Sequence, residues 1–236
     1  MQKTIALTLI SSFLLLAACN KKNATSTDNS SENANMKMYE KAMEMGDFQT
    51  AIYSLNLFLQ TDSSDVKWYD TLAVLYINTN NFLPASWCAD KVLKNKPKEL
   101  RMLELKAMAE QQLGRRDKIL DVYKSLFEIT GNYQYMYQTA AVEFTAGNID
   151  RCKSLIDSMM TSKNISKDSI DIQVSEDESQ KVPLKAAIYN LQAFIKARDG
   201  KYPEAKKDFE NALRIFPDFI LAKKNLQDLM QGGRQR

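Results

Sequence analysis

The sequence predicts an all-α fold of about five helix–turn–helix repeats that ends in a closing helix. The first observation is a turn residue that recurs as Gly46, Asn80, Gly114, Gly147 and Gly200, at spacings of 34, 34, 33 and 53 residues. The second is the placing of apolar residues on both sides of each turn at i, i+3, i+4 and i+7, the period of an amphipathic helix. The third is composition, because 236 residues contain only seven Gly and five Pro.

The clearest repeat runs from Ala186 to Pro217 and turns at residues 199–201. Small and aromatic residues share one face of each helix: Tyr189, Ala193 and Ala197 in the first, and Ala205, Phe209, Ala212 and Leu213 in the second. Pro203 is tolerated in the first turn of the second helix, where an N–H has no partner in the helix. This order of residues resembles the tetratricopeptide repeat (TPR), a unit of about 34 residues.

The resemblance implies a right-handed superhelical solenoid of TPR units. Repeats 1–4 are expected over residues 35–161, with helices at 35–45, 48–61, 65–79, 82–95, 98–113, 116–130, 132–146 and 148–162. Repeat 5 is expected at residues 183–217, a polar-faced capping helix at 218–231 and a tail at 232–236. A small residue five positions after each turn lets the paired helices approach closely: Ala51, Ala85, Cys152 and Ala205. Repeat 3 departs from the pattern, with Ile119 at this position and with Lys106 and Glu110 in place of apolar and aromatic residues.

The first 18 residues form a predicted signal peptide. Lys3 supplies a positive charge, and the apolar run from Ile5 to Ala18 is shorter than the roughly 18–20 residues of a membrane span. The run ends in Leu16-Ala17-Ala18-Cys19, which resembles the lipobox of lipoproteins from Gram-negative bacteria. That resemblance implies cleavage before Cys19 and acylation of Cys19, with acyl chains as the membrane anchor. The alternatives are an ordinary signal peptide with an incidental Cys and a plain N-terminal transmembrane anchor.

Residues 19–34 are expected to be the lipidated Cys followed by a disordered tether, because they are rich in Asn, Ser and Thr. In enteric lipoproteins an Asp after the Cys retains the protein in the inner membrane. Asn20 stands there instead, which favours the outer membrane and leaves the periplasmic and surface faces both open.

An insert separates repeats 4 and 5. Residues 162–182 add 19 residues to the repeat period and combine an alternating run, Ile170, Ile172 and Val174, with the acidic stretch SEDES. We expect a surface loop that is functional, accommodating or disordered, with a strand-like piece or a helix extension as alternatives.

The residue content argues against most enzyme classes. No His is present, so the chain lacks Ser–His–Asp and Cys–His sites and HExxH zinc sites. It also has neither nucleotide fingerprint, no paired-Cys zinc spacing and no basic patch for nucleic acid. Cys88 and Cys152 are predicted to be buried thiols without a disulfide. We therefore expect no enzyme activity, cofactor, metal or nucleic-acid partner.

A binding groove is what the TPR resemblance implies, on the face formed by the first helix of each repeat. Carried over position by position, the groove residues are Asp70, Val74, Ile77, Asn78, Arg101, Glu104, Met108, Gln111, Tyr137, Ala141, Phe144, Asn190, Phe194 and Arg198. Met108, Tyr137, Phe144 and Phe194 would anchor a peptide, with Arg101 and Arg198 beside them. The alternative is that these side chains only pack between neighbouring helices.

The sequence thus favours a membrane-anchored TPR scaffold that binds a partner protein or peptide in the cell envelope. Its oligomeric state stays open. The competing hypotheses are a surface accessory protein that handles nutrients or glycans, and an enzyme that uses the insert.

Overall fold

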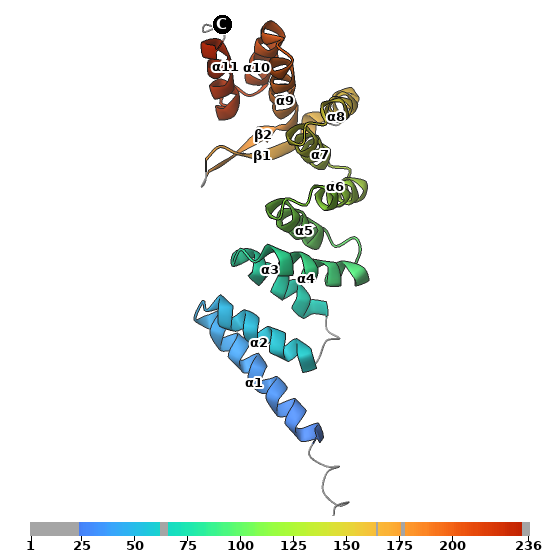
Figure 1. The fold of residues 1–236 in the computed structure, drawn as a ribbon, viewed down its shortest axis with the longest axis vertical. Helices are drawn as coiled ribbons and strands as arrows, with labels where there is room; N and C mark the ends of the chain where they lie inside the picture. Colours follow the sequence, from blue (N-terminus) through green and yellow to red (C-terminus); the bar gives the residue numbers. More distant parts are fainter. Residues whose placement is uncertain (1–23, 62–65, 164, 176–177, 233–236) are drawn as a thin grey trace, which may run out of the picture. The chain divides into compact units, whose positions relative to one another are not determined.

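A computed structural model describes residues 24–61, 66–163, 165–175 and 178–232 (Figure 1). The chain divides into two compact units, residues 1–65 and 66–236. The predicted signal peptide, Cys19 and most of the predicted tail lie outside the described residues. Within the described ranges, no helix combines the length and the apolar character that crossing a membrane requires.

The first unit is a helical hairpin of α1 (Ala24–Glu44) and α2 (Phe48–Thr61). Ala51 and Leu55 are fully buried between the two helices. Helix α1 begins 11 residues before the predicted start at residue 35, so residues 24–34 are helical rather than a disordered tether. The polar composition of residues 24–34 favoured a disordered tether, so the sequence did not predict this extension of the helix. Once a helix is nucleated by packing, each further residue adds a hydrogen bond at little cost.

The second unit begins with three helix pairs. They are α3 (Val66–Asn78) with α4 (Phe82–Asn95), α5 (Leu100–Gln112) with α6 (Arg116–Thr130), and α7 (Tyr133–Thr145) with α8 (Ile149–Thr161). Each helix contacts the next in the chain, and α5 also contacts α3. These bounds lie within two residues of the predicted ones. The small residues predicted at the close contacts, Ala85 and Cys152, are fully buried.

The recurring turn residues share a left-handed backbone. The φ angle is 82° at Gly147 and 58° at Asn80, the one non-Gly residue with positive φ among those described. This conformation closes a helix C-terminus, and Gly and Asn tolerate it best. The turn therefore explains why a Gly or Asn marked each repeat in the sequence.

The insert is a β-hairpin rather than a surface loop. A short 3₁₀ helix, η1 (Ile165–Lys167), precedes β1 (Ser169–Gln173), which pairs antiparallel with β2 (Ser179–Pro183). Ile170 lies opposite Val182, and both are buried in the core. In Figure 1 the hairpin extends from the stack on the side of α5, while α6 and α8 lie on the other side.

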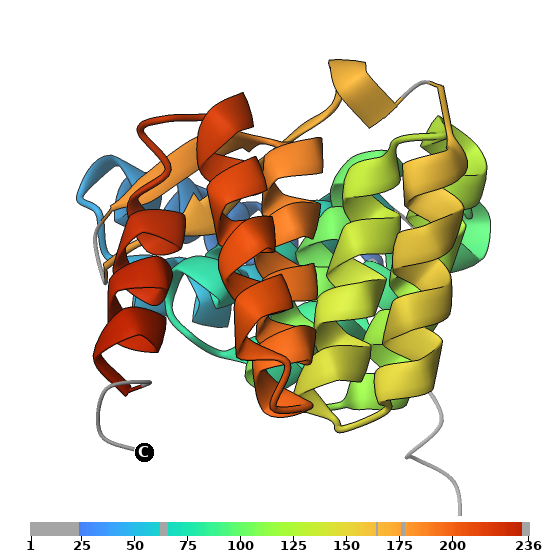
Figure 2. The same ribbon diagram turned by 90° about the horizontal axis from the view of Figure 1, so that it is seen from above.

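The chain ends with α9 (Leu184–Arg198), α10 (Tyr202–Ile215) and α11 (Ile220–Gly232). Figure 2 shows α7, α8, α9 and α10 side by side, and α9 contacts α7, α8 and α10. One apolar core joins these helices to the hairpin and includes Ile156, Val182, Ile188 and Phe219. Pro183 ends β2 instead of starting α9. In α11 the buried residue is Ala222, and Leu221, Leu226 and Leu229 are half-buried.

Candidate functional site

The first helices α3, α5, α7 and α9 carry the predicted groove residues. On α3 and α5, Arg101 forms an ion pair of 3.0 Å with Asp70. On α5 and α7, the Tyr135 hydroxyl donates a 2.6 Å hydrogen bond to Glu104 Oε1. Burial, followed by this bond to Glu104, raises the pKa of Tyr135 to about 12. Three of the predicted groove residues thus link successive first helices. Of the others on α3, Val74 and Ile77 are half-buried and Asn78 is exposed.

Two of the predicted anchors are open to solvent. Met108 on α5 is 52% exposed, and Phe194 on α9 is 38% exposed. Phe144 on α7 is half-buried, with its ring centroid 6.3 Å from that of Phe194, which meets Phe209 edge-on at 5.8 Å. Arg198 is exposed at the end of α9. Phe144 and Phe194 therefore pack with α10, while part of the Phe194 surface stays exposed.

Two predicted groove residues are wrong. Tyr137 is buried in the core cluster that also holds Ile165, Ile170 and Val182 of the insert. Burial raises the pKa of the Tyr137 hydroxyl. Asn190 is buried as well, and its Oδ1 accepts a 3.0 Å hydrogen bond from Asn225 Nδ2 of α11. The core cluster encloses Tyr137 and α11 holds Asn190, so neither side chain is open to a partner.

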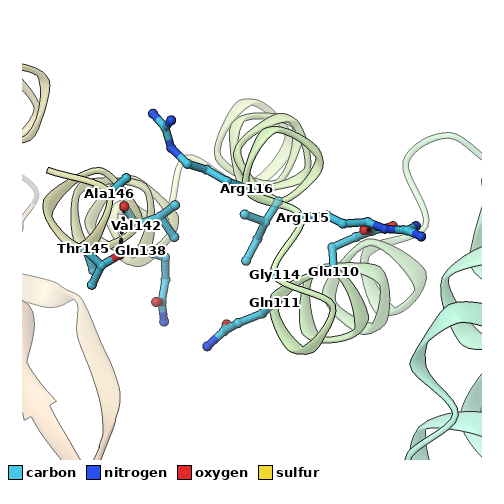
Figure 3. Close-up of a pocket in the computed structure, with 11 residues that line it drawn as sticks. Glu110, Gln111, Gly114, Arg115, Arg116, Gln138, Val142, Thr145 and Ala146 are labelled. Atoms are coloured by element: carbon cyan, nitrogen blue, oxygen red, sulfur yellow. Dashed lines mark hydrogen bonds and ion pairs between the residues drawn. The ribbon is translucent and has the colours of Figure 1, made fainter. Parts of the chain in front are cut away.

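A cavity of about 370 Å³ lies between α5, α6 and α7 (Figure 3). Gln111 and Ala141, both predicted to face the groove, line it. Ile119, Val142 and Ala141 supply apolar surface. Figure 3 shows the carboxamides of Gln111 and Gln138 extending from α5 and α7, while Arg115 and Arg116 point elsewhere.

The two carboxamides give the cavity its chemistry. Gln111 Oε1 accepts a hydrogen bond of 3.3 Å from Tyr123, which leaves its NH₂ available. A carboxamide can donate to a peptide C=O and accept from a peptide N–H at the same time. A small apolar surface with convergent amide groups is therefore suited to an uncharged stretch of polypeptide with a modest apolar side chain.

Glu110 and Glu143 are two fully buried carboxylates that sequence reasoning did not place in any site. Glu143 Oε2 accepts hydrogen bonds from Arg116 (2.5 Å) and Asn148 (2.8 Å), and Arg151 Nε lies 2.9 Å from Oε1. Burial by itself would raise the pKa of Glu143. The hydrogen bonds from Asn148 and Arg116 and the charges of Arg151 and Arg116 outweigh burial and lower this pKa.

Glu110 occupies the same position one repeat earlier. Ser86 of α4 donates a hydrogen bond to its Oε1, and Lys118 Nζ lies 3.8 Å from the same oxygen. Lys118 and Arg151 are 33 residues apart, as are Glu110 and Glu143. Each buried Glu thus binds the second helix of the preceding repeat and a cation of its own repeat. The recurrence of Glu at a spacing of 33 residues is the sequence signal from which these two residues could have been found. Their role is to join successive repeats.

The two described thiols are inert. Cys88 and Cys152 are buried and form no disulfide, as predicted. Burial raises the pKa of Cys88 to about 12 and that of Cys152 to about 11, so both stay protonated at neutral pH. Across the described ranges, no group of three or more Cys, Asp or Glu side chains is arranged to hold a metal ion.

Comparisons with known proteins identify the fold. No protein-family model matches the chain, and no curated protein matches its sequence. Among solved structures, YrrB, described as a TPR protein with an unusual peptide-binding site, is similar with a TM-score of 0.57 and 14% identity over 88% of this chain and 98% of YrrB. The MamA protein has a TM-score of 0.56 and 16% identity over 79% of this chain and 92% of MamA.

A third similar structure is a MamA fragment, residues 41 to the end, from Desulfovibrio magneticus, with a TM-score of 0.55 and 13% identity over 80% of this chain and 97% of that one. The fold is that of a TPR protein. At these identities the likeness establishes the helical repeat architecture, and the function has to be argued from the chain's own residues.

Proposed function

We propose that this TPR protein is a non-enzymatic adaptor in a cell-envelope assembly. A segment of a partner protein binds along α3, α5 and α7. An acylated Cys19 anchors the chain to the outer membrane of a Gram-negative bacterium. Binding and anchoring rest on different residues and can be tested separately.

The cavity beside Gln111 and Gln138 is the observation that carries the binding proposal. Its lining combines these two amide groups with apolar surface from Ile119 and Val142. The exposed Met108 lies on the same helix as Gln111. An unbranched Met side chain adapts to differently shaped apolar partners. Together these groups would recognise peptide backbone and a small apolar side chain, which is what a protein-binding groove requires.

The absence of His from the sequence supports an adaptor rather than an enzyme. The common neutral-pH general base is therefore missing, and the buried thiols cannot serve as nucleophiles at their raised pKa values. The buried Glu143 is engaged by Arg116, Asn148 and Arg151, so it is not available as a general acid or base.

Site-specific photo-crosslinking tests the binding proposal. A photoreactive amino acid is placed at Gln138 or Met108 in cells, and at Lys124 as a matched control, because Lys124 is an exposed residue of a second helix. We expect one protein adduct of defined mass from the first two positions and none from Lys124. Equal labelling at all three positions, or no adduct at Gln138 and Met108, would refute the groove.

The anchor is tested by Cys19→Ser. The motive is the run Leu16-Ala17-Ala18-Cys19, since Cys19 is the acceptor that a lipobox requires. The variant should accumulate as an unlabelled precursor when cells are fed an acyl label, while wild type is labelled and fractionates with the outer membrane. A variant that is labelled and fractionates like wild type would remove the anchor from the proposal and leave the groove untouched.

A further inference from the structure

The hydrogen-bond pattern of the β-hairpin defines two outer edges. Just beyond its ends, Val174 N–H donates to Glu178 O (2.9 Å) and Leu184 N–H donates to Asp168 O (3.0 Å). In an antiparallel pair, hydrogen-bonded and non-hydrogen-bonded residue pairs alternate. The even-numbered residues of β1 therefore bond to β2, and the N–H and C=O of Ser169 and Asp171 point away from β2.

The two edges differ in how they are protected. The outward residues of β2 include Lys181 and Pro183, and Pro has no N–H to offer. Lys and Pro are the residues that commonly block an edge strand against pairing. The β1 edge has neither. Within the described ranges, no backbone group of another segment bonds to Ser169 or Asp171 on this side.

Contacts at both ends of the hairpin hold the β1 edge in place. Asp168 Oδ2, just before β1, accepts a 3.1 Å hydrogen bond from Tyr133 N–H at the start of α7. On β2, Gln180 donates to Asp218 O (2.7 Å) and accepts from Ile220 N–H (3.0 Å), which ties β2 to the start of α11. In Figure 1, β1 is accordingly the strand nearer α7 and α5, the helices that line the cavity.

The side chains of β1 specify what could pair with it. Ile170 is buried and Ile172 is half-buried on the face that packs on the core, whereas Asp171 is exposed on the opposite face. The described carboxylates at and beside β1 are Asp168, Asp171 and Glu178, and Lys181 of β2 is the cation opposite Asp171, so acidic groups outnumber it. A third strand beside β1 would extend both faces, with apolar residues beside Ile170 and Ile172 and a basic residue beside Asp171.

We propose that the outer edge of β1 binds an extended segment of the partner protein, in which apolar and basic residues alternate, as a third antiparallel or parallel strand. This inference rests on the proposed adaptor function and names the chemistry of its partner. Main-chain hydrogen bonds to Ser169 and Asp171 supply the attachment, and the alternation of side chains supplies the selectivity.

A second copy of this chain is the less suitable occupant. Pairing two β1 strands over their full length about a two-fold axis would place Asp171 directly opposite Asp171. Like charges opposite one another destabilise a strand pair. A basic segment from another protein avoids this repulsion.

The test uses a blocked synthetic peptide of about seven residues that alternates Val and Lys, with fluorescence anisotropy as the readout. A second peptide of the same sequence carries an N-methyl group on every backbone amide, which removes strand pairing through either edge and keeps the charge. The protein variants are Ser169→Pro, which removes an outward N–H, and Asp171→Asn, which removes only the charge. Ser179→Pro is the matched control, because Ser179 points its N–H out on the other edge.

Wild type and Ser179→Pro should bind the unmethylated peptide equally, and Ser169→Pro should bind at least about tenfold more weakly. Asp171→Asn should bind more weakly with a smaller salt dependence. Circular dichroism confirms that each variant is folded. Equal binding of the methylated peptide, or unchanged binding by a folded Ser169→Pro, overturns the inference. So does a wild-type dimer that Ser169→Pro dissociates. If crosslinking at Gln138 succeeds while these results are negative, the edge fails and the adaptor function stands.

Discussion

The buried carboxylate of Glu143 gives a sharp stability prediction. It receives two hydrogen bonds and an ion pair, and no part of it is exposed, whereas the side chains of Arg116 and Arg151 are 38% and 65% exposed. Removing one member of a fully buried ion pair costs about 3–5 kcal/mol, and a hydrogen bond to a charged group contributes about 1.5–3 kcal/mol. The two arginines regain water when the carboxylate is removed. We therefore expect Glu143→Ala to lower the free energy of unfolding by about 2–3 kcal/mol.

Thermal melts followed by circular dichroism measure this effect. A loss of this size lowers the Tm by about 5–10 °C in a domain of 150–250 residues. The matched control is Glu128→Ala, whose exposed carboxylate lies 3.9 Å from Lys124 and should change stability by less than about 0.5 kcal/mol. If Glu143→Ala melts within about 1 °C of the control, the buried carboxylate does not hold the repeats together.

The pH dependence of a second variant, Glu143→Gln, has a definite sign. The pKa of Glu143 is lowered in the folded protein, so its carboxylate contributes stability that is complete above the unfolded pKa of about 4.3. That contribution is lost as the pH falls through the folded pKa. The stability difference between wild type and Glu143→Gln should therefore be constant between about pH 5 and 7 and shrink below about pH 4. A difference that grows on acidification would contradict the lowered pKa.

Two further predictions concern the repeat register and the turns. Ala85→Leu and Ala205→Leu should each destabilise the protein by about 1–3 kcal/mol in denaturant titrations, because both Ala side chains are fully buried where paired helices meet. Ala34→Leu, at an exposed position, is the control. Unchanged midpoints for both buried variants would refute the repeat register. Gly147→Ala should lower the free energy of unfolding by about 1–2 kcal/mol through backbone strain alone, because φ at Gly147 is 82° and an added Cβ would meet no atom within 4 Å. Gly232 has no positive φ, so Gly232→Ala should leave stability unchanged. Equal effects of the two substitutions would contradict backbone strain as the cause.

The helices could be predicted from the sequence because local and repeated signals agreed. Gly147 and Asn80 marked turns for a backbone reason that no other side chain satisfies well, and the positions of Ala85 and Cys152 followed from the same frame. Ile119 departed from the frame and lines the cavity between α5, α6 and α7. The departure from the repeat pattern coincides with the cavity: at Ile119 a branched side chain replaces the small residue that lets paired helices approach closely in the other repeats.

The hairpin could be predicted only in part. The alternation of Ile170 and Ile172 indicated a strand, but its partner strand, Ser179–Pro183, has a single buried residue, Val182. Pairing then depends on long-range contacts such as Gln180 with Asp218 and Asp168 with Tyr133, which no local pattern reveals.

Two groove predictions failed because the side chains are buried, and this reduces the set of first-helix residues that can contact a partner. In a regular repeat the positions of Tyr137 and Asn190 would face the open groove. In this chain Tyr137 lies in the core cluster that also includes the insert, and Asn190 is hydrogen-bonded to α11. Gln111 and Ala141 stay accessible in the cavity, because neither the hairpin nor α11 is among the elements that line it. The insert therefore contributes Ile170 and Val182 to the core that holds Tyr137, and it presents the outward backbone groups of Ser169 and Asp171 on the α5 side. A partner that binds here would be expected to use the amides of α5 and α7 and the edge of β1 rather than the aromatic anchor that a regular repeat would offer.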